Sequence, residues 1–313
     1  MAESRAMRAL CEGLVDYAGL FPPAKLDMQP TVERYARYSM GVRSWMLGRL
    51  ICPASRLEEL SERGAPLMPG TFATSGYREH ADSMPAWGVS VVADMPMGET
   101  LDAMSAFDEK HGRDERGLAR IGCVEMRATS AEAIDDAMDA VPDDIQPFFE
   151  VPAEGDIRGV LAALAGEDGC AKIRCGGVEA SMIPSSERIA DFVVSCARAG
   201  IAFKATAGLH HPVRAEQALT YEDDAPRAVM HGYVNVFLGA VMYKAKRIDE
   251  EQLVALLDEA DAGAFAFDDD GAGWRDASVG VLDIAKGRES FALSYGSCSF
   301  EEPVDDAAAL GWL

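Results

Sequence analysis

The chain has 313 residues and a net charge of −23, and 49% of its residues are hydrophobic. A chain of this composition can build a large core, which excludes a disordered or fibrous protein. The excess of acidic residues repels nucleic acid and anionic membranes, so we expect neither as a partner. No apolar run reaches the roughly 18 residues that span a bilayer, and residues 1–16 lack the pattern of a signal peptide. We therefore expect a cytoplasmic protein, whose acidity fits either a high-salt cytoplasm or an ordinary one.

Seven cysteines are scattered along the chain without a Cys-x-x-Cys pair. Their odd number and their spacing argue against a disulfide framework and against a structural zinc site. Most of them lie in apolar segments, where we expect them in the core. Cys298 lies in a Gly/Ser-rich stretch and is the only cysteine that we retain as a functional candidate.

Apolar runs of strand length alternate with helical segments along nearly the whole chain. The predicted strands span residues 15–21, 46–52, 89–93, 119–126, 146–151, 171–174, 202–206 and 291–295. The predicted helices between them span residues 31–44, 55–63, 99–110, 130–141, 157–166 and 185–199. The last of these begins with Ser-Ser-Glu and ends at Gly200, which is favourable capping chemistry at both ends.

Strands that alternate with helices at a spacing of roughly 30 residues indicate βαβ units and a parallel sheet. Eight such units favour an α/β fold of one domain, a (β/α)8 TIM barrel over residues 1–313. The alternative is an open, doubly wound sheet. A further helix, at residues 303–310, is expected after the eighth strand.

A large insertion separates strands 7 and 8 of the predicted barrel, over residues 209–289. It is predicted to contain helices at 227–246 and 250–259, and a hairpin that pairs 264–267 with 272–275. The turn of this hairpin has the sequence Asp-Asp-Asp-Gly. We expect the insertion to cover the mouth of the barrel as a lid, with His210 and His211 at its base.

Lys172 and Lys204 are the leading candidates for chemistry. Each lies within an apolar strand, where lysine is rarely placed without a reason, so each is expected to point into the barrel. Burial and a neighbouring cation both lower the pKa of an ammonium group, and a lysine that is neutral near pH 7 can form a Schiff base. The alternative is that either lysine forms a structural ion pair with Glu125 or Glu150.

Other polar residues are predicted at the carboxyl ends of the strands, where barrel enzymes build their sites. Glu150 ends the apolar run Phe-Phe-Glu-Val-Pro, which is expected to raise its pKa toward that of a general acid. His210 and His211 are candidates for proton transfer. A metal site would combine one of these histidines with Glu150 or Asp94.

A Gly-Ser-Cys-Ser turn follows the eighth strand and is a candidate phosphate cradle. In barrels, backbone N–H groups after strands 7 and 8 commonly bind phosphate. The candidate binding residues for an anionic substrate are Tyr17, Asp94, Arg174, Gly208, Gly296, Ser297 and Ser299. The alternative is an ordinary tight turn that leads into the last helix.

These motifs resemble the class I, Schiff-base aldolases of the deoxyribose-phosphate aldolase type. The similar segments read Ala-Lys172-Ile-Arg-Cys-Gly-Gly, Phe-Lys204-Ala-Thr-Ala-Gly, Tyr-Gly296-Ser-Cys-Ser and Val91-Val-Ala-Asp94-Met-Pro-Met-Gly. The resemblance covers short motifs within residues 45–210 and 291–300. It implies that Lys172 forms the imine, that Lys204 lies beside it, and that Glu125 assists proton transfer.

We therefore predict a lyase-type barrel enzyme that acts on a small oxo compound, phosphorylated or carboxylated, and requires no cofactor. Arg174 and the turn at 296–299 would hold the anionic group. Two alternatives stay open: a metal-dependent hydrolase or isomerase that uses the histidines, and an inactive barrel that serves as a binding protein. The sequence also leaves open whether the chain forms a homo-oligomer.

Overall fold

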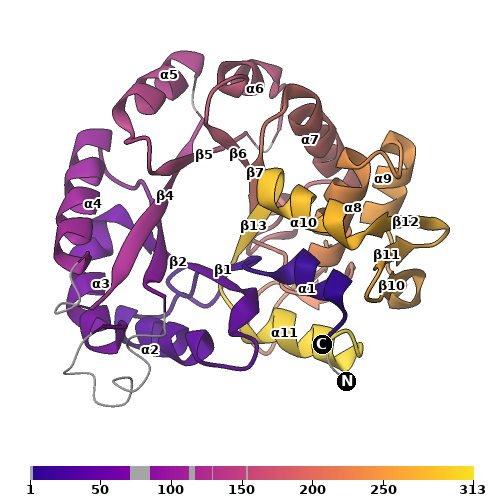
Figure 1. Cartoon of the computed structure of the whole chain (residues 1–313), viewed down its shortest axis with the longest axis horizontal. Helices are drawn as coiled ribbons and strands as arrows, with labels where there is room; N and C mark the ends of the chain where they lie inside the picture. The colour runs from indigo at the N-terminus through magenta and orange to yellow at the C-terminus, as the bar shows by residue number, and fades with distance from the viewer. Residues whose placement is uncertain (1–2, 71–84, 113–116, 129, 153) are drawn as a thin grey trace.

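The computed structural model describes residues 3–70, 85–112, 117–128, 130–152 and 154–313. Eight parallel strands close into a barrel in the order β1-β13-β7-β6-β5-β4-β3-β2 (Figure 1). They are β1 (Val15–Tyr17), β2 (Leu47–Pro53), β3 (Trp87–Val92), β4 (Ala119–Arg127), β5 (Gln146–Glu150), β6 (Cys170–Arg174), β7 (Phe203–Thr206) and β13 (Ala292–Ser297). The predicted TIM barrel is confirmed, and the open sheet is wrong.

Helices surround the barrel as an outer layer (Figure 1). Those described are α1 (Arg5–Cys11), α2 (Met28–Ser39), α3 (Leu57–Gly64), α4 (Met97–His111), α5 (Ala131–Ala140), α6 (Arg158–Leu164), α7 (Ser186–Ala199), α8 (Tyr233–Lys244), α9 (Glu250–Leu257), α10 (Val281–Ser290) and α11 (Glu301–Ala309). The caps of α7 are as predicted: the Ser185 side chain accepts from the N–H of Arg188, and Gly200 has a left-handed φ of 75°.

The segment between β7 and β13 differs from its prediction at several points. Residues 227–246 do not form one helix, because β9 (Arg227–Met230) pairs with β8 (Ala215–Ala218) before α8 begins. The predicted hairpin is present as β10 (Phe265–Phe267) and β11 (Gly271–Trp274), but a third strand, β12 (Ala277–Gly280), joins it. The alternation of small and polar residues in this third strand is too weak a signal to predict it.

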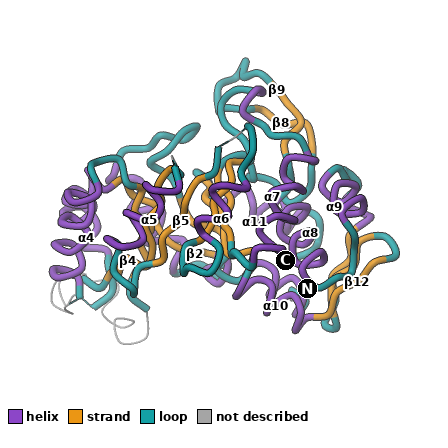
Figure 2. Tube along the Cα trace, turned by 90° about the horizontal axis from the view of Figure 1, so that it is seen from above, coloured by secondary structure: helices purple, strands orange, loops and turns teal. Residues whose placement is uncertain are grey.

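The elements of residues 209–289 do not lie together at one end of the barrel. The β8–β9 hairpin projects from one end of the barrel, whereas β12 and α10 lie toward the other end (Figure 2). The β10–β12 sheet packs against α1, where the N–H of Ala6 donates to the carbonyl of Asp268 at 3.1 Å. Within residues 209–289, the β8–β9 hairpin and the segment with His210 and His211 border the cavity at the carboxyl ends of the barrel strands.

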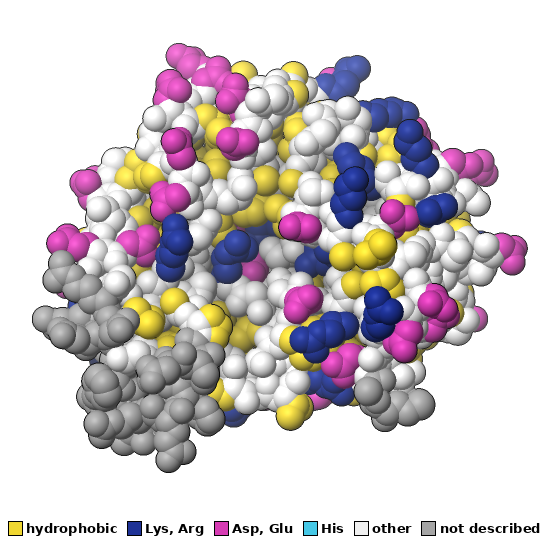
Figure 3. Space-filling model, viewed as in Figure 1, with side chains coloured by type: hydrophobic (Ala, Val, Ile, Leu, Met, Phe, Trp, Pro, Cys, Tyr) yellow, Lys and Arg dark blue, Asp and Glu magenta, His cyan; other side chains and the backbone are white. Residues whose placement is uncertain are grey.

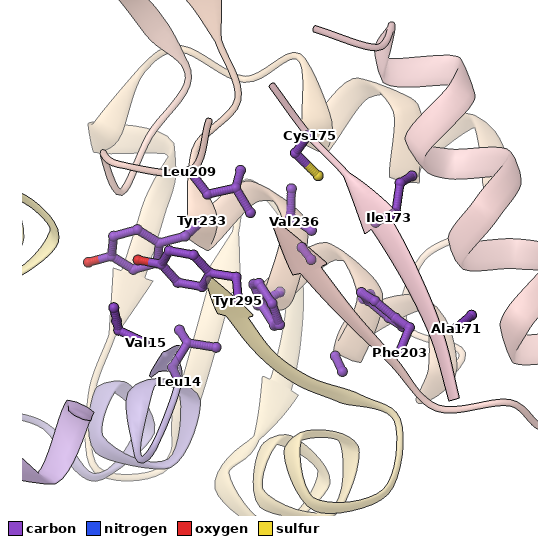
Figure 4. Close-up of a cluster of buried hydrophobic side chains, with 14 of the residues drawn as sticks. Leu14, Val15, Ala171, Ile173, Cys175, Phe203, Leu209, Tyr233, Val236 and Tyr295 are labelled. Carbon is purple, nitrogen blue, oxygen red and sulfur yellow. The ribbon is translucent and has the colours of Figure 1, made fainter. Parts of the chain in front are cut away.

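Helix α8 packs directly on the barrel wall and is buried over most of its length. Figure 4 shows Tyr233 beside Tyr295 of β13, with Val236 facing the same cluster. The Tyr233 and Tyr295 rings stack with centroids 5.7 Å apart, and Phe237 stacks on Phe203 of β7 at 6.1 Å. Helix α8 is therefore one of the helices of the barrel's outer layer.

The alternation of side chains along β6 and β7 separates the core from the site. Ala171 and Ile173 pack outward into the cluster of Figure 4, and so does Phe203. Lys172 and Lys204, which are register partners on the two strands, point into the barrel. A small apolar cluster of Cys123, Phe148 and Cys170 fills the barrel interior on the amino-terminal side of these lysines.

The described surface carries charges of both signs. Figure 3 shows acidic and basic side chains interspersed with uncharged ones on one face of the molecule. Among the described residues, no helix combines the length and the apolar character needed to cross a membrane.

We expect Phe237→Ala to lower the free energy of unfolding by about 3–5 kcal/mol, because the aromatic ring is fully buried between α8 and β7. Urea denaturation followed by circular dichroism measures the change. Leu282→Ala is the matched control, because Leu282 is 83% exposed and its truncation should change stability by less than about 0.5 kcal/mol. A loss below about 1 kcal/mol for Phe237→Ala would contradict this packing.

Candidate functional site

A cavity of about 880 Å³ opens at the carboxyl ends of the barrel strands. Its lining includes ten of the residues singled out from the sequence: Asp94, Glu125, Glu150, Lys172, Arg174, Gly208, His210, His211, Gly296 and Cys298. Four others do not line it: Tyr17, Lys204, Ser297 and Ser299. The hairpin contributes Tyr221 and Met230 to the wall, so the lid, which remains a proposal, is best assigned to β8 and β9.

Glu125 of β4 lies at the centre of a buried ion-pair network. Its Oε2 atom is 2.8 Å from Nζ of Lys172, and its Oε1 atom is 2.7 Å from Nζ of Lys204. Lys204 also contacts Asp16 Oδ2 at 2.7 Å, and Lys172 contacts Glu150 Oε2 at 2.9 Å. Two lysines and three carboxylates thus share one continuous network, and the ion pairs considered as the alternative from the sequence are present.

The ion pairs around Lys204 and Glu150 reverse two of the pKa shifts expected from the sequence. Burial alone would lower the pKa of Lys204, but Asp16 and Glu125 outweigh burial and raise it. Burial alone would raise the pKa of Glu125, yet Lys204 and Lys172 hold it well below its usual range. The pKa of Glu150 is lowered as well, because Lys172 and Arg174 outweigh its burial. The expectation of a raised pKa for Glu150 is therefore wrong.

Asp16 is a central residue of this network that the sequence analysis did not select. It is fully buried on β1, where Oδ1 accepts from the N–H of Arg49 at 2.8 Å and Oδ2 accepts from Ser294 at 2.8 Å. A Cβ atom at position 48 would lie 2.3 Å from Oδ1, so Gly48 leaves room for this carboxylate. The signal was available, since Val-Asp-Tyr places a charge inside an apolar strand as clearly as the lysine strands do.

Ser90 of β3 is a further hydrogen-bond partner of Glu125 in this network. Its hydroxyl donates to Glu125 Oε1 at 2.6 Å and accepts from the thiol of Cys123 at 3.0 Å. Ser90 is fully buried and lies in the run Val-Ser-Val. The buried carboxylate therefore has a neutral donor in addition to its two cations.

The two neighbouring histidines have separate partners. His210 is 2.7 Å through Nδ1 from Glu302 of α11 and 3.8 Å through Nε2 from the Cys298 sulfur. His211 binds Asp306 through Nδ1. Neither partner was proposed from the sequence, because α11 follows the histidines by about 90 residues.

The residues required for a metal site are not brought together. Asp94 accepts from the hydroxyl and the N–H of Ser55, and Glu150 binds Lys172. Over the described residues, no group of three or more His, Cys, Asp and Glu side chains is arranged to hold a metal ion. The histidines and carboxylates of that hypothesis thus bind other partners in this structure.

The Gly-Ser-Cys-Ser turn uses its hydroxyls within the turn. Ser297 Oγ accepts from the N–H of Ser299 at 3.3 Å, and Ser299 Oγ accepts from the N–H of Glu302 at 3.2 Å. This is the bonding of a turn that leads into a helix. The carboxylate of Glu302 also lines the cavity beside the turn, where it would repel a phosphate.

Packing explains the presence of two further candidates, Tyr17 and Gly208. Tyr17 is fully buried on β1 and packs edge to face on Tyr38, with ring centroids 5.4 Å apart. Gly208 has φ +72°, and a Cβ atom added to it would lie 2.7 Å from the Cα of Gly176. The loops after β6 and β7 therefore need glycine at both positions in order to pass each other.

Arg127 and Arg174 place guanidinium groups at the cavity wall. They end β4 and β6, the two strands that flank β5. The Arg174 guanidinium lies 3.3 Å from Glu150, and its side chain is 41% exposed. These two residues are the best placed to bind an anionic group of a ligand.

Comparison of the chain with protein-family models, with curated proteins and with solved structures gave no match. The chain is a (β/α)8 barrel on the basis of its own strand order. Its activity has to be argued from the site.

We expect Lys204→Met to lower the free energy of unfolding by about 3–5 kcal/mol, because it leaves Asp16 and Glu125 as buried carboxylates without this cation. Urea denaturation at neutral pH measures the change. Lys286→Met is the control, because Lys286 is exposed on α10. Equal stability of the two variants would show that Lys204 contributes nothing to the fold.

A second prediction concerns acid stability. The folded-state pKa of Glu125 is lowered, so its contribution is present above the unfolded pKa of about 4.3 and is lost as the pH falls. We expect the unfolding free energy of Glu125→Gln to depend less steeply on pH than that of the unmodified chain, between about pH 6 and pH 3. Glu58→Gln, at an exposed position on α3, should keep the original slope. Parallel slopes for all three proteins would contradict the shift.

Proposed function

We propose that this barrel is a Schiff-base lyase that makes or breaks a carbon–carbon bond next to the carbonyl group of a small, anionic oxo compound. The observation that carries the proposal is the position of Lys172. Its Nζ atom borders the cavity between two carboxylates, Glu125 and Glu150, at 2.8 and 2.9 Å. Lys204 is fully buried behind Lys172. In this proposal it neutralises carboxylate charge in the network and does not contact a ligand.

Glu150 is the proposed proton acceptor for Lys172. Its pKa is lowered partly by the ammonium group of Lys172 itself, against the effect of burial. When Lys172 transfers its proton, that attraction disappears and burial then favours the protonated carboxyl group. The neutral amine can attack the carbonyl carbon, and the protonated Glu150 can return the proton as water leaves.

The carbon–carbon step follows from the imine. The bond between the carbons α and β to the imine carbon breaks, and its electron pair moves toward the nitrogen to form an enamine. The proton of the β-hydroxyl group goes to a carboxylate of the network, either Glu150 or Glu125. Arg127 and Arg174 would hold a carboxylate or phosphate group of the substrate at the wall. This arrangement requires no cofactor.

Borohydride trapping tests the proposal. We expect reduction in the presence of a small aldehyde or ketone, such as glycolaldehyde or pyruvate, to attach the carbonyl compound to Lys172, as mass spectrometry of the digested protein would show. Lys172→Arg should abolish trapping at this position while keeping a cation between the two carboxylates. Because the variant keeps the charge, its unfolding free energy should stay within about 1 kcal/mol of the original.

The alternative of a non-catalytic binding barrel draws on one observation, that both lysines lie in ion pairs. It predicts that neither glycolaldehyde nor pyruvate modifies Lys172, even at alkaline pH, although the protein is folded. That result would refute the Schiff-base mechanism. Modification spread over exposed lysines, with Lys172 no more reactive than they are, would refute it as well.

A further inference from the structure

Cys298, His210 and Glu302 form a second chemical group in the cavity wall. The Cys298 sulfur is 3.8 Å from Nε2 of His210, and Nδ1 of the same ring is 2.7 Å from Glu302 Oε2. All three residues line the cavity. A thiol, an imidazole and a carboxylate in this order have the geometry in which a base activates a nucleophile and a third group orients the base.

Three elements hold this group together. Cys298 follows β13, His210 follows β7, and Glu302 lies in the first turn of α11. The Tyr221 hydroxyl, from the loop of the hairpin, donates to Glu302 at 2.9 Å and lies 3.5 Å from the Cys298 sulfur. Tyr221 therefore contacts both partners of the His210 imidazole.

The charges around the sulfur favour a thiolate. Burial alone would raise the pKa of Cys298, but His210, Tyr221 and the backbone N–H of Ala24 outweigh it and lower the pKa. Burial alone would lower the pKa of His210, but its bonds to Cys298 and Glu302 raise it to about 10. Among the residues that the structure describes, the other titratable groups facing this cluster include Tyr17 of β1, Tyr295 of β13 and His211.

The remaining cysteines provide an internal comparison. All seven are buried and free. Burial raises the pKa of the Cys175 thiol to about 12, and it raises the pKa of Cys11, Cys52, Cys123, Cys170 and Cys196 as well. Cys298 is the one cysteine whose pKa is lowered, and it is also the one that lines the cavity.

We propose that Cys298 is a nucleophile which, as a thiolate paired with the His210 imidazolium, reversibly captures the carbonyl carbon of an aldehyde in the cavity. The sulfur forms a bond to the carbonyl carbon, and the electron pair of the C=O double bond moves to the oxygen. That oxygen takes the proton of the His210 imidazolium, so the product is a neutral hemithioacetal. The step needs no oxidant and does not involve Lys172.

Alkylation by iodoacetamide tests the ion pair, with each cysteine followed by mass spectrometry of peptides. Below its pKa an ordinary thiol reacts about ten times faster for each added pH unit, because only the thiolate attacks. We expect the rate at Cys298 to change by less than twofold between about pH 6 and pH 8. In His210→Gln it should fall at least tenfold at pH 6 and regain the ordinary pH dependence.

Cys175 in the same digests is the control for general exposure, and it should stay unmodified. Glu302→Gln is the second variant, and it should lower the rate at Cys298 at pH 6 by at least threefold, because the imidazolium loses its anionic partner. An ordinary pH dependence in the unmodified chain would overturn the ion pair. A rate that is unchanged in both variants would overturn it too.

Protection by an aldehyde tests the capture step. Glycolaldehyde should slow the alkylation of Cys298 in a concentration-dependent way, whereas ethylene glycol, which lacks the carbonyl group, should not. The protection should persist in Lys172→Arg, which separates it from imine formation. If protection disappears in that variant, the aldehyde binds only through Lys172 and the hemithioacetal is refuted. If borohydride trapping fails but protection persists, the Schiff-base function alone is refuted.

Discussion

The barrel interior depends on the ion pairs that the Glu125 carboxylate forms with two lysines. Each of its two oxygens binds a different lysine, and Ser90 donates to the one that also binds Lys204. Without this carboxylate, two ammonium groups on adjacent strands would face each other in a water-poor interior, which is strongly unfavourable. With it, the charged side chains of β1, β4, β5, β6 and β7 form one layer of paired charges between an apolar cluster and the open cavity.

The fold and part of this charged layer could be predicted from the hydrophobic periodicity of the sequence and from the charged residues within its apolar runs. A lysine inside an apolar strand must point into the barrel, and Lys172 and Lys204 do. Asp16 was missed, although its pattern is the same, because site residues were expected at the carboxyl ends of the strands and Asp16 lies near the start of the predicted strand 15–21. The partners of His210 could not be predicted either, since the approach of α11 depends on how the chain between 211 and 301 is laid out in space.

The direction of the pKa shifts could not be read from the lysines alone. Two neighbouring cations lower each other's pKa only if no anion compensates them, and the count of carboxylates in the layer decides the sign. Asp16 and Glu125 both bind Lys204, and together they outweigh its burial and raise its pKa. A prediction from sequence would have to place every inward charge of all eight strands before it could assign one shift.

A compensated network does not by itself oppose imine chemistry. Glu125 and Glu150 lie 2.8 and 2.9 Å from the ammonium group of Lys172, which must lose a proton before its nitrogen can attack a carbonyl group. The protonated imine, however, carries its positive charge on the same nitrogen atom. In the proposed reaction the two carboxylates would stabilise this iminium ion, the form that withdraws electrons from the breaking bond. The carboxylates that bind the Lys172 ammonium group would thus also stabilise the positive charge of the reactive intermediate in the proposed reaction.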